Sequence, residues 1–398
     1  MRDMLPEEMA RFRRVERAFR EVALGWGYEE VRTPTIEHLH LFTAAGTLSP
    51  QMLGRVYSFL DWDGWRGERV VLRPDSTIPV ARLYSEQSEP GSAGRYFYVQ
   101  NVFRFAQGDE SREDWQCGIE LIGDTQPLGD VQLMLVAGEV CRSLGVAVEI
   151  ILSDPAILRV VLAKAGYESA EQLAHYDRIL DGQLSVLDEV AARVPGAGPL
   201  ASLLSLRGEG VAYLENLRAA LLPAVPELER PLAELAAVSE ILEHLGAKHV
   251  IAPLLVRDFE YYTGPVFHFE AGGSKVGGGG RYDALIGLVS GANVPASGFA
   301  LEMQLIVDRL GEAEESEERL LLIQPRGRDN GDLAAALMMA RALRESGRRV
   351  RIVANDFTAI APYIVAASDG FEFKMDGAAP KRFTRPEELV SALAGTGP

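Results

Sequence analysis

Four separate segments of the chain carry polar side chains that together could bind a small zwitterion. They are residues 72–77 (LRPDST), 102–104 (VFR) with 116–120 (QCGIE), 255–264 (LVRDFEYYTG) and 278–283 (GGGRYD). Asp75, Gln116 and Glu120 supply acceptors, and the arginines and tyrosines supply donors. An ammonium group needs carboxylate acceptors, a carboxylate needs the fork of an arginine, and a polar side chain needs its own partner in the pocket. The combination therefore indicates a site for an amino acid.

The sequence contains no motif that is typical of a metal site or of a phosphate-binding loop. The six histidines are accompanied by no H-E-x-x-H or paired-cysteine pattern, so we expect neither a metal nor another cofactor. The run Gly277–Gly280 lacks the Gly-Lys-Ser/Thr ending of a phosphate-binding loop, because Arg281 and Tyr282 follow it. Such a run more often marks backbone packed closely against backbone, which is the interpretation we favour.

Composition limits the classes of protein to which the chain can belong. Its 398 residues are 47% hydrophobic and 24% charged, which is typical of a soluble globular protein with about two or three domains. The net charge of −17 disfavours binding to nucleic acid, because an acidic surface repels a polyanion. We find no secretion signal, no apolar run of membrane-spanning length and only two cysteines, so we expect a cytoplasmic protein.

The elements that must position the polar residues can be predicted from periodicity. Apolar residues at steps of three and four predict a helix over residues 6–26, and residues 128–144 favour a second. Several strands come before the next long helical run, which suits an antiparallel or mixed sheet better than alternating βαβ units. The predicted strands are residues 28–33, 70–73, 96–105, 118–122 and 146–152.

The rest of the chain divides into three parts. Residues 155–246 predict a helical insertion, and residues 261–270 predict a strand that Gly272 and Gly273 end in a hairpin turn. A helical pattern follows near residues 299–310. The charged segment 312–319 separates a first domain, residues 1–312, from a small α/β domain, residues 319–398. In the small domain we expect strands at 320–324 and 350–353 and a helix at 333–345.

At these motifs the chain resembles the catalytic domain of histidyl-tRNA synthetase, a class II synthetase. The likeness covers about residues 1–312, with residues 27–34 similar to motif 1 and residues 298–300 similar to motif 3. Two segments, R-x-x-x-Y-Y-T-G from Arg257 and G-G-G-R-Y-D from Gly278, resemble signatures of the histidine-specific family. The resemblance implies an α+β fold, with an antiparallel or mixed sheet flanked by helices and a small C-terminal α/β domain.

The resemblance also implies a histidine-binding site and a role for its residues. Asp75, Thr77 and Gln116 would hold the α-amino group, Glu120 and Tyr262 the imidazole, and Arg257 the carboxylate. Arg104 is retained from motif 2, and Tyr261, Gly279 and Arg281 would line the same pocket. Asp75 stands where the synthetases have Glu. The aspartate keeps the negative charge, but its side chain is shorter and reaches less far into the pocket.

The chain differs from the synthetase pattern at the positions that bind ATP in the synthetases. Leu305 stands where the last arginine of motif 3 would clamp the γ-phosphate of ATP, and an apolar group cannot replace that charge. Ala106 stands where motif 2 has a glutamate that meets adenine. The loop that follows carries Asp109, Glu110, Glu113 and Asp114, which would repel phosphates. We therefore expect amino-acid recognition without catalysis.

The C-terminal segment has no broad basic face for RNA, since Arg348, Arg349 and Arg351 form its only local cluster. The whole chain resembles the regulatory-subunit family of ATP phosphoribosyltransferase. That resemblance implies a non-catalytic subunit in histidine biosynthesis that binds histidine as feedback effector. It also implies activation of a short catalytic subunit, and a homodimer within a larger hetero-oligomer, with no nucleic-acid or membrane partner. Two alternatives remain, an active histidyl-tRNA synthetase and a free-standing enzyme that adenylates another amino acid.

Overall fold

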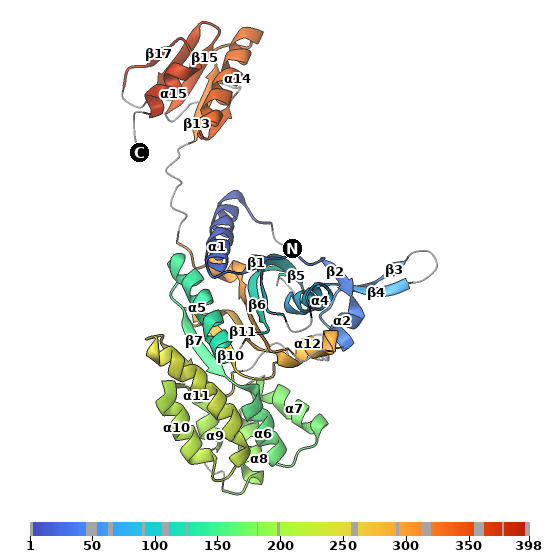
Figure 1. The fold of residues 1–398 in the computed structure, drawn as a ribbon. Coiled ribbons are helices and arrows are strands. Elements are labelled where there is room, and N and C mark those ends of the chain that lie inside the picture. The colour runs from blue at the N-terminus through green and yellow to red at the C-terminus, as the bar shows by residue number, and fades with distance from the viewer. Residues whose placement is uncertain are drawn as a thin grey trace. The chain divides into compact units, whose positions relative to one another are not determined.

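Strands rich in Val, Ile, Tyr and Phe build the sheet that organises the first part of the chain (Figure 1). The computed structural model describes residues 3–44, 54–62, 67–89, 92–105, 111–124, 126–180, 182–196, 200–255, 262–291, 294–311, 320–353, 362–375 and 378–394. The chain divides into two compact units, Met1–Gly311 and Glu312–Pro398.

Within the described residues, the large sheet of the first unit has nine strands in the order β1-β5-β6-β12-β11-β10-β7-β9-β8. The central strands, β5-β6-β12-β11-β10-β7, all pair antiparallel with their neighbours in this run. At the two sides of this run, β1 pairs with β5 and β9 pairs with β7 in parallel. The bounds are β1 Glu29–Glu30, β5 Gly94–Phe103, β6 Glu113–Ile122, β7 Glu149–Ser153, β8 Gly208–Glu209, β9 His249–Ile251, β10 Val266–Ala271, β11 Ser274–Arg281 and β12 Ala296–Glu302.

One face of this sheet carries the main hydrophobic core. Helices α1 (Pro6–Gly25), α5 (Leu128–Ser143) and α13 (Met303–Val307) pack there. Pro6 starts α1 where its missing N–H costs nothing, and Phe12, Val15 and Phe19 form the buried stripe of that helix. Alternate residues of β6, such as Cys117 and Ile119, point into the same core.

The opposite face carries a second apolar cluster that helices α4 (Thr77–Gln87) and α12 (Asp283–Ser290) share. Beside them lie the short helix α2 (Leu39–Ala44) and a three-stranded antiparallel sheet in the order β2-β4-β3. Its bounds are β2 Ile36–His38, β3 Ser58–Trp62 and β4 Gly67–Leu72. In Figure 1 the ribbon of β3 and β4 extends away from the large sheet.

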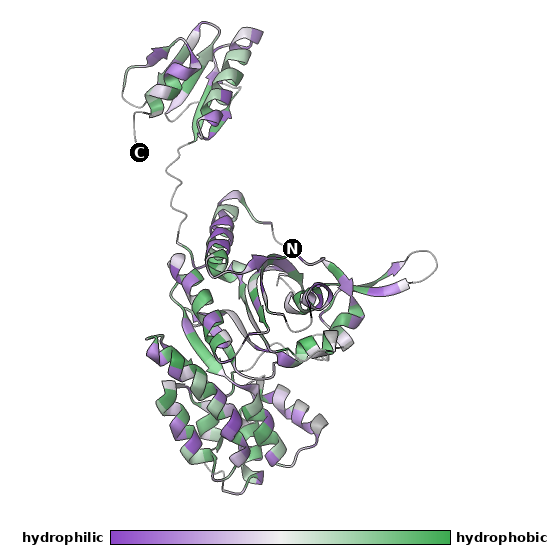
Figure 2. Cartoon of the chain, in the orientation of Figure 1, coloured by the Kyte–Doolittle hydropathy of each residue, from purple (hydrophilic) through white to green (hydrophobic). Residues whose placement is uncertain are grey.

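The segment predicted as a helical insertion is helical in the structure. It holds α6 Pro155–Lys164, α7 Ser169–Leu180, α8 Ser185–Arg193, α9 Leu200–Ser205, α10 Gly210–Leu221, the 3-10 turn η1 Pro226–Leu228 and α11 Glu229–His244. Hydrophobic and hydrophilic residues alternate along these helices (Figure 2), as amphipathic packing requires. Asp154 caps α6 by accepting a hydrogen bond from the amide of Ala156 at 2.8 Å.

In its described residues, the second unit has a five-stranded sheet in the order β14-β13-β15-β16-β17, with α14 and α15 packed against it. The bounds are β13 Leu321–Pro325, α14 Asn330–Glu345, β14 Val350–Ile352, β15 Tyr363–Ala367, β16 Gly370–Lys374, β17 Lys381–Phe383 and α15 Pro386–Ala394. Strand β13 is parallel to β14 and β15, which confirms the predicted parallel α/β pairing. The remaining strands pair antiparallel.

Most predicted elements are confirmed, but several have different bounds. The strands predicted at 146–152 and 261–270 begin, among the described residues, only at Glu149 and Val266. The strand predicted at 28–33 is only β1, Glu29–Glu30, although the amide of Val31 still donates to the carbonyl of Phe97 at 2.9 Å. The helix predicted near 299–310 is wrong for its first residues, because β12 extends to Glu302. Pairing with β6 on one side and β11 on the other overrides the local helical pattern there. Among the described residues, no helix combines the length and apolar character of a membrane span.

Candidate functional site

The face of the large sheet opposite the main core has a glycine-rich floor. Gly118 of β6, Gly298 of β12 and Gly280 of β11 lie on neighbouring strands. An added Cβ at Gly118 would collide with the phenol of Tyr98, and one at Gly298 would collide with the carboxylate of Glu120. Small residues on the floor thus leave room for the polar side chains that lie across it.

Glu120 is the buried centre of this polar cluster. The hydroxyl of Tyr98 donates to Oε1 of Glu120 at 3.3 Å, the hydroxyl of Tyr282 donates to Oε2, and Thr77 adds another side-chain hydrogen bond. Burial is the largest cause that raises the pKa of Glu120, the nearby charge of Asp75 also raises it, and the hydroxyl groups lower it, which together give a pKa of about 8. The protonation state of Glu120 near neutral pH therefore depends on the charges and hydrogen-bond donors that contact its carboxyl group.

Asp75 supplies a second buried carboxyl group, at the start of α4. Its Oδ1 accepts a hydrogen bond from the amide of Ile78 at 2.9 Å, and the amides of Ser76 and Thr77 also donate to the carboxylate. Burial raises the pKa of Asp75, while these amides and the charge of Arg104 lower it. Because the amides fix the carboxylate at the helix terminus, its position is set before any ligand arrives.

A third cluster lies further along the same face of β6 and β12. Nε2 of Gln116 donates to Oε1 of Glu302 at 2.7 Å, and the two residues are opposite each other in the ladder. Burial raises the pKa of Glu302, whereas Arg104 lowers it. Nε of Arg104 donates to the carbonyl of Pro74 at 2.9 Å. Since Nε2 of Gln116 is engaged, its amide oxygen is the atom that can accept from a ligand.

The structure brings Asp75, Thr77 and Glu120 into one cluster and places Tyr262 beside it. The phenol of Tyr262 influences the pKa of Tyr282, and a Cβ at Gly280 would lie 2.9 Å from the ring of Tyr262. Arg257 and Tyr261 lie outside the described residues. So do Ala106, Asp109 and Glu110 of the predicted acidic loop.

Two residues predicted to line the pocket lie on the other face of the sheet. Gly279 packs its backbone against Phe299 in the main core, and an added Cβ there would collide with the carbonyl of Gly298. Strand alternation puts Arg281 on the same side as Gly279, so the side chain of Arg281 leads away from Glu120. The glycine run is thus a close packing of strands, as we predicted, with Gly278 and Gly280 on the face of Glu120.

Arg281 instead forms a buried ion-pair network. Its guanidinium contacts Asp130 of α5 and Glu234 of α11, each at 2.6 Å. The hydroxyl of Ser297 donates to the other oxygen of Asp130 at 2.7 Å. Burial raises the pKa of Asp130, and the charge of Arg281 lowers it. Arg281 therefore connects the helical insertion to the end of β11, directly before Tyr282.

Sequence reasoning missed three residues of the site, namely Tyr98, Tyr282 and Glu302. Tyr282 was visible in the G-G-G-R-Y-D segment, and strand alternation would have placed it on the side opposite Arg281. Tyr98 and Glu302 become evident only when the register pairs them with Gly118 and Gln116. Neither pairing follows from local spacing.

The cluster as a whole offers acceptors for nitrogen-bearing groups. Two buried carboxyl groups and an amide oxygen suit an ammonium and an imidazole ring. Within the described ranges, no three His, Cys, Asp or Glu side chains gather closely enough to hold a metal ion. The geometry fits reversible binding of a small polar molecule.

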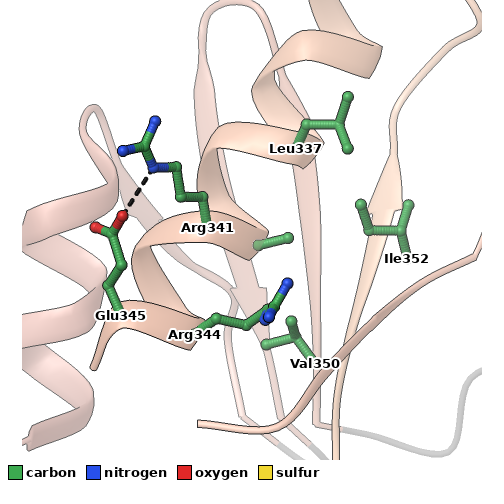
Figure 3. A pocket seen from close by; sticks show the side chains of 7 residues that line it. Leu337, Arg341, Arg344, Glu345, Val350 and Ile352 are labelled. Carbon is green, nitrogen blue, oxygen red and sulfur yellow. Dashed lines mark hydrogen bonds and ion pairs between the residues drawn. The ribbon is translucent and has the colours of Figure 1, made fainter. Parts of the chain in front are cut away.

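A separate groove lies in the second unit, between α14 and β14 (Figure 3). Its lining combines apolar side chains with Arg341 and Arg344, and Nε of Arg341 donates to Oε1 of Glu345 at 2.7 Å. The apolar residues are Leu337, Ala340, Val350 and Ile352. The groove shares no residue with the Asp75 and Glu120 cluster.

Comparison with known proteins gives a consistent picture. The family model described as histidyl-tRNA synthetase matches residues 1–306. A protein named ATP phosphoribosyltransferase regulatory subunit, from Dehalococcoides mccartyi, is 43% identical over 87% of this chain and 84% of its own length. A histidine–tRNA ligase from Methanosarcina acetivorans is 33% identical over 81% of this chain and 77% of its own length.

The solved structures include one of a protein from Bacillus halodurans described as an ATP phosphoribosyltransferase regulatory subunit/histidyl-tRNA synthetase. It matches with a TM-score of 0.74 and 26% identity, over 90% of this chain and 93% of that one. The expected class II synthetase-like fold is thereby confirmed. The chain belongs to the histidyl-tRNA synthetase family, together with the ATP phosphoribosyltransferase regulatory subunits that it resembles over most of its length.

Proposed function

We propose that the chain is the regulatory subunit of an ATP phosphoribosyltransferase and senses histidine in the Asp75 and Glu120 cluster. One combination carries the proposal. Buried acceptors for an amino acid are present on the sheet, while Leu305 stands where a synthetase holds ATP with an arginine. The 43% identity to a protein named as such a regulatory subunit supports the same role.

In this role the chain performs no chemistry itself. A short catalytic subunit joins ATP to 5-phosphoribosyl diphosphate, releasing diphosphate and forming phosphoribosyl-ATP. The present chain activates that partner and relays the level of histidine, the end product of the pathway. Histidine shifts the activity only if it binds one arrangement of the complex better than another.

The bound histidine is held by the residues that form the cluster. Asp75, Thr77 and the amide oxygen of Gln116 accept from the α-amino group, and Glu120 with Tyr262 holds the imidazole ring. Arg257 pairs with the carboxylate, with Arg104 nearby, and Tyr261, Gly279 and Arg281 complete the predicted set. For Gly279 and Arg281, which lie on the opposite face, the role we propose is to position the end of β11, which Tyr282 follows directly.

Binding of the imidazole ring would change the protonation state of Glu120. Burial without a cation raises the pKa of Glu120 to about 8, so the empty pocket holds it largely protonated at neutral pH. An imidazole that brings a proton of its own favours the carboxylate form. Binding therefore exchanges protons with solvent, which calorimetry in buffers of different ionisation enthalpy measures.

We further propose that the chain acts in the cytoplasm as a homodimer that assembles with catalytic subunits, without nucleic acid. A direct test of the effector role is calorimetric titration of the full chain with histidine and with other amino acids. Saturable binding of histidine alone is the expected result. Absence of binding, both by the chain alone and with a catalytic subunit present, would contradict the effector role.

The alternative of an active synthetase predicts a different reaction. A synthetase exchanges label between diphosphate and ATP when histidine is present. We expect no histidine-dependent exchange, because an apolar residue occupies the position of the motif 3 arginine. An enzyme that adenylates another amino acid would show exchange with that amino acid instead.

A further inference from the structure

Glu302 ends β12 with its side chain directed to the polar face of the large sheet. It occupies the N-terminal cap position of α13, yet its side chain makes no capping hydrogen bond. Oε1 of Glu302 instead accepts from Nε2 of Gln116 at 2.7 Å, across the ladder between β12 and β6. The carboxyl group is thus turned toward the site and away from the helix that follows it.

The second carboxyl oxygen of Glu302 has capacity for a ligand. No described residue donates a hydrogen bond to Oε2 of Glu302 or to the amide oxygen of Gln116. Gln116 is buried, whereas Glu302 is half-buried and so keeps contact with the space above the sheet. Because an ionised carboxylate accepts several hydrogen bonds, the bond from Gln116 leaves most of that capacity unused. The pair therefore presents two oxygen acceptors side by side.

Asp75 and Glu302 share one nearby cation. Burial raises the pKa of both carboxyl groups, and the charge of Arg104 lowers both. Beside Glu302, Asp114 raises that pKa and Lys275 lowers it, so these two charges oppose each other. One guanidinium balances only one of the two carboxylates. This part of the site therefore suits a cationic group of a ligand, which would favour the ionised form of both carboxyl groups.

Glu302 lies at the end of the site away from Glu120. On β6, Gln116 and Glu120 are four residues apart on the same face, about 13 Å along the strand, with a glycine midway. Asp75 acts electrostatically on Glu120, and Arg104 acts on both Asp75 and Glu302, so Asp75 lies between the two ends. A histidine whose ring lies at Glu120 thus has its α-amino group on the side of Gln116 and Glu302.

An ammonium group at this end needs three acceptors, because it has three N–H donors. Asp75 and the amide oxygen of Gln116 supply two. Thr77 is neutral, and its hydroxyl already forms hydrogen bonds with Glu120 and Tyr98. A further acceptor that carries a charge completes the set better than a hydroxyl that is already engaged.

We infer that Glu302 makes the site specific for a free α-amino group, because its Oε2 accepts from the ammonium beside Asp75 and the amide oxygen of Gln116. The inference rests on the proposed histidine site and adds a residue to it. The ligand class that follows is an imidazole compound with an unblocked, positively charged amine. A compound without the amine leaves the excess negative charge unpaired, which costs affinity.

Removal of the charge at residue 302 tests the inference and keeps the contact with Gln116. In Glu302→Gln the side-chain amide oxygen can still accept from Nε2 of Gln116, so the strand pairing retains this bond. We expect the dissociation constant for histidine to rise about tenfold or more, measured by calorimetry on the full chain, alone and with the catalytic subunit. Glu302→Asp keeps the charge and should lose less affinity than Glu302→Gln.

Two ligands that each lack one end of histidine show which end Glu302 recognises. Histamine keeps the amine and has no carboxylate, and 3-(imidazol-4-yl)propionate keeps the carboxylate and has no amine. Glu302→Gln should weaken the binding of histamine about as much as that of histidine, and should leave the binding of imidazolepropionate within about twofold of wild type. Glu270→Gln is the matched control, because Glu270 is also half-buried but pairs with Arg207 at 3.1 Å. This control should bind histidine as wild type does.

Unchanged affinity of Glu302→Gln for histidine would overturn the inference. Equal losses for all three ligands would overturn it as well, because a residue that only supports the sheet does not distinguish an amine from a carboxylate. A wild-type chain that binds no histidine, alone or with the catalytic subunit, would instead refute the proposed histidine site. The two failures are therefore distinguishable.

Discussion

Replacement of Arg281 by alanine should destabilise the first unit far more than replacement of a surface arginine. The guanidinium of Arg281 lies between Asp130 and Glu234, 2.6 Å from each, and joins α5, α11 and the end of β11. Asp130 is almost completely inaccessible to solvent. The alanine variant would leave that carboxylate with the hydroxyl of Ser297 but without a cation.

The magnitude follows from the burial of the pair. Removal of one partner from a buried ion pair costs about 3–5 kcal/mol, because the remaining charge stays desolvated. Arg230 is the matched control, since Nε of Arg230 contacts the same Glu234 at 2.9 Å while its own side chain is 85% exposed. A surface pair of that kind contributes about 0–1 kcal/mol.

Tryptophan fluorescence during urea denaturation is a suitable assay. All four tryptophans, Trp26, Trp62, Trp65 and Trp115, belong to the first unit, so the signal reports its unfolding. Arg281→Ala should lower the free energy of unfolding by about 3–5 kcal/mol, and Arg230→Ala by less than about 1 kcal/mol. Equal losses in the two variants would refute the reasoning.

The same variant should respond to pH in a defined direction. Burial raises the pKa of Asp130, and Arg281 opposes that rise. Without the guanidinium the pKa rises further in the folded state, so stability is lost as pH increases through it. The deficit of Arg281→Ala relative to wild type should therefore shrink as pH falls from 8 to 5.

Three other predictions concern Glu120 and the packing of β11 on the opposite face of the sheet. Glu120→Ala should weaken histidine binding by about 2–4 kcal/mol in calorimetry, because it leaves the bound ring without its buried acceptor, and unchanged affinity would remove Glu120 from the site. With the pKa of Glu120 raised to about 8, the folded state holds a proton that the unfolded state has lost, so the wild-type free energy of unfolding should fall from about pH 5 to 8. Glu120→Gln should make that decline shallower, and an identical slope would contradict the assignment. Gly279→Ala should reduce the yield of folded protein or lower the free energy of unfolding by more than about 2 kcal/mol, since its Cβ would collide with backbone, whereas Gly138→Ala meets no atom within 4 Å and should be tolerated.

Patterns within short stretches of the sequence predicted those elements whose structure does not depend on pairing with strands far away in the chain. The stripe of Phe12, Val15 and Phe19 repeats with the helical period, and α1 occupies Pro6–Gly25 as expected. The glycine run was likewise interpretable, because four successive residues without side chains permit close approach of neighbouring strands.

The arrangement of the site depends on pairings that local sequence does not contain. Phe299 lies in a locally helical pattern, yet β12 forms because β6 and β11 flank it on both sides. The direction of Arg281 also depends on register, since a strand reverses sides at each residue and Tyr282 faces Glu120 instead. The motifs and the resemblance pointed to Asp75, Thr77 and Glu120, which lie together, whereas the sheet register decides that Gly279 and Arg281 face the other side.

The regulatory role that we propose requires this chain to control a catalytic partner in response to histidine. The most direct measurement combines the full chain with a short-form ATP phosphoribosyltransferase catalytic subunit and follows the formation of phosphoribosyl-ATP. We predict that the chain increases the rate, that histidine reverses the increase, and that the Glu120→Ala variant activates the partner but no longer responds to histidine. A matched catalytic subunit whose rate changes neither with the chain nor with histidine would contradict this prediction.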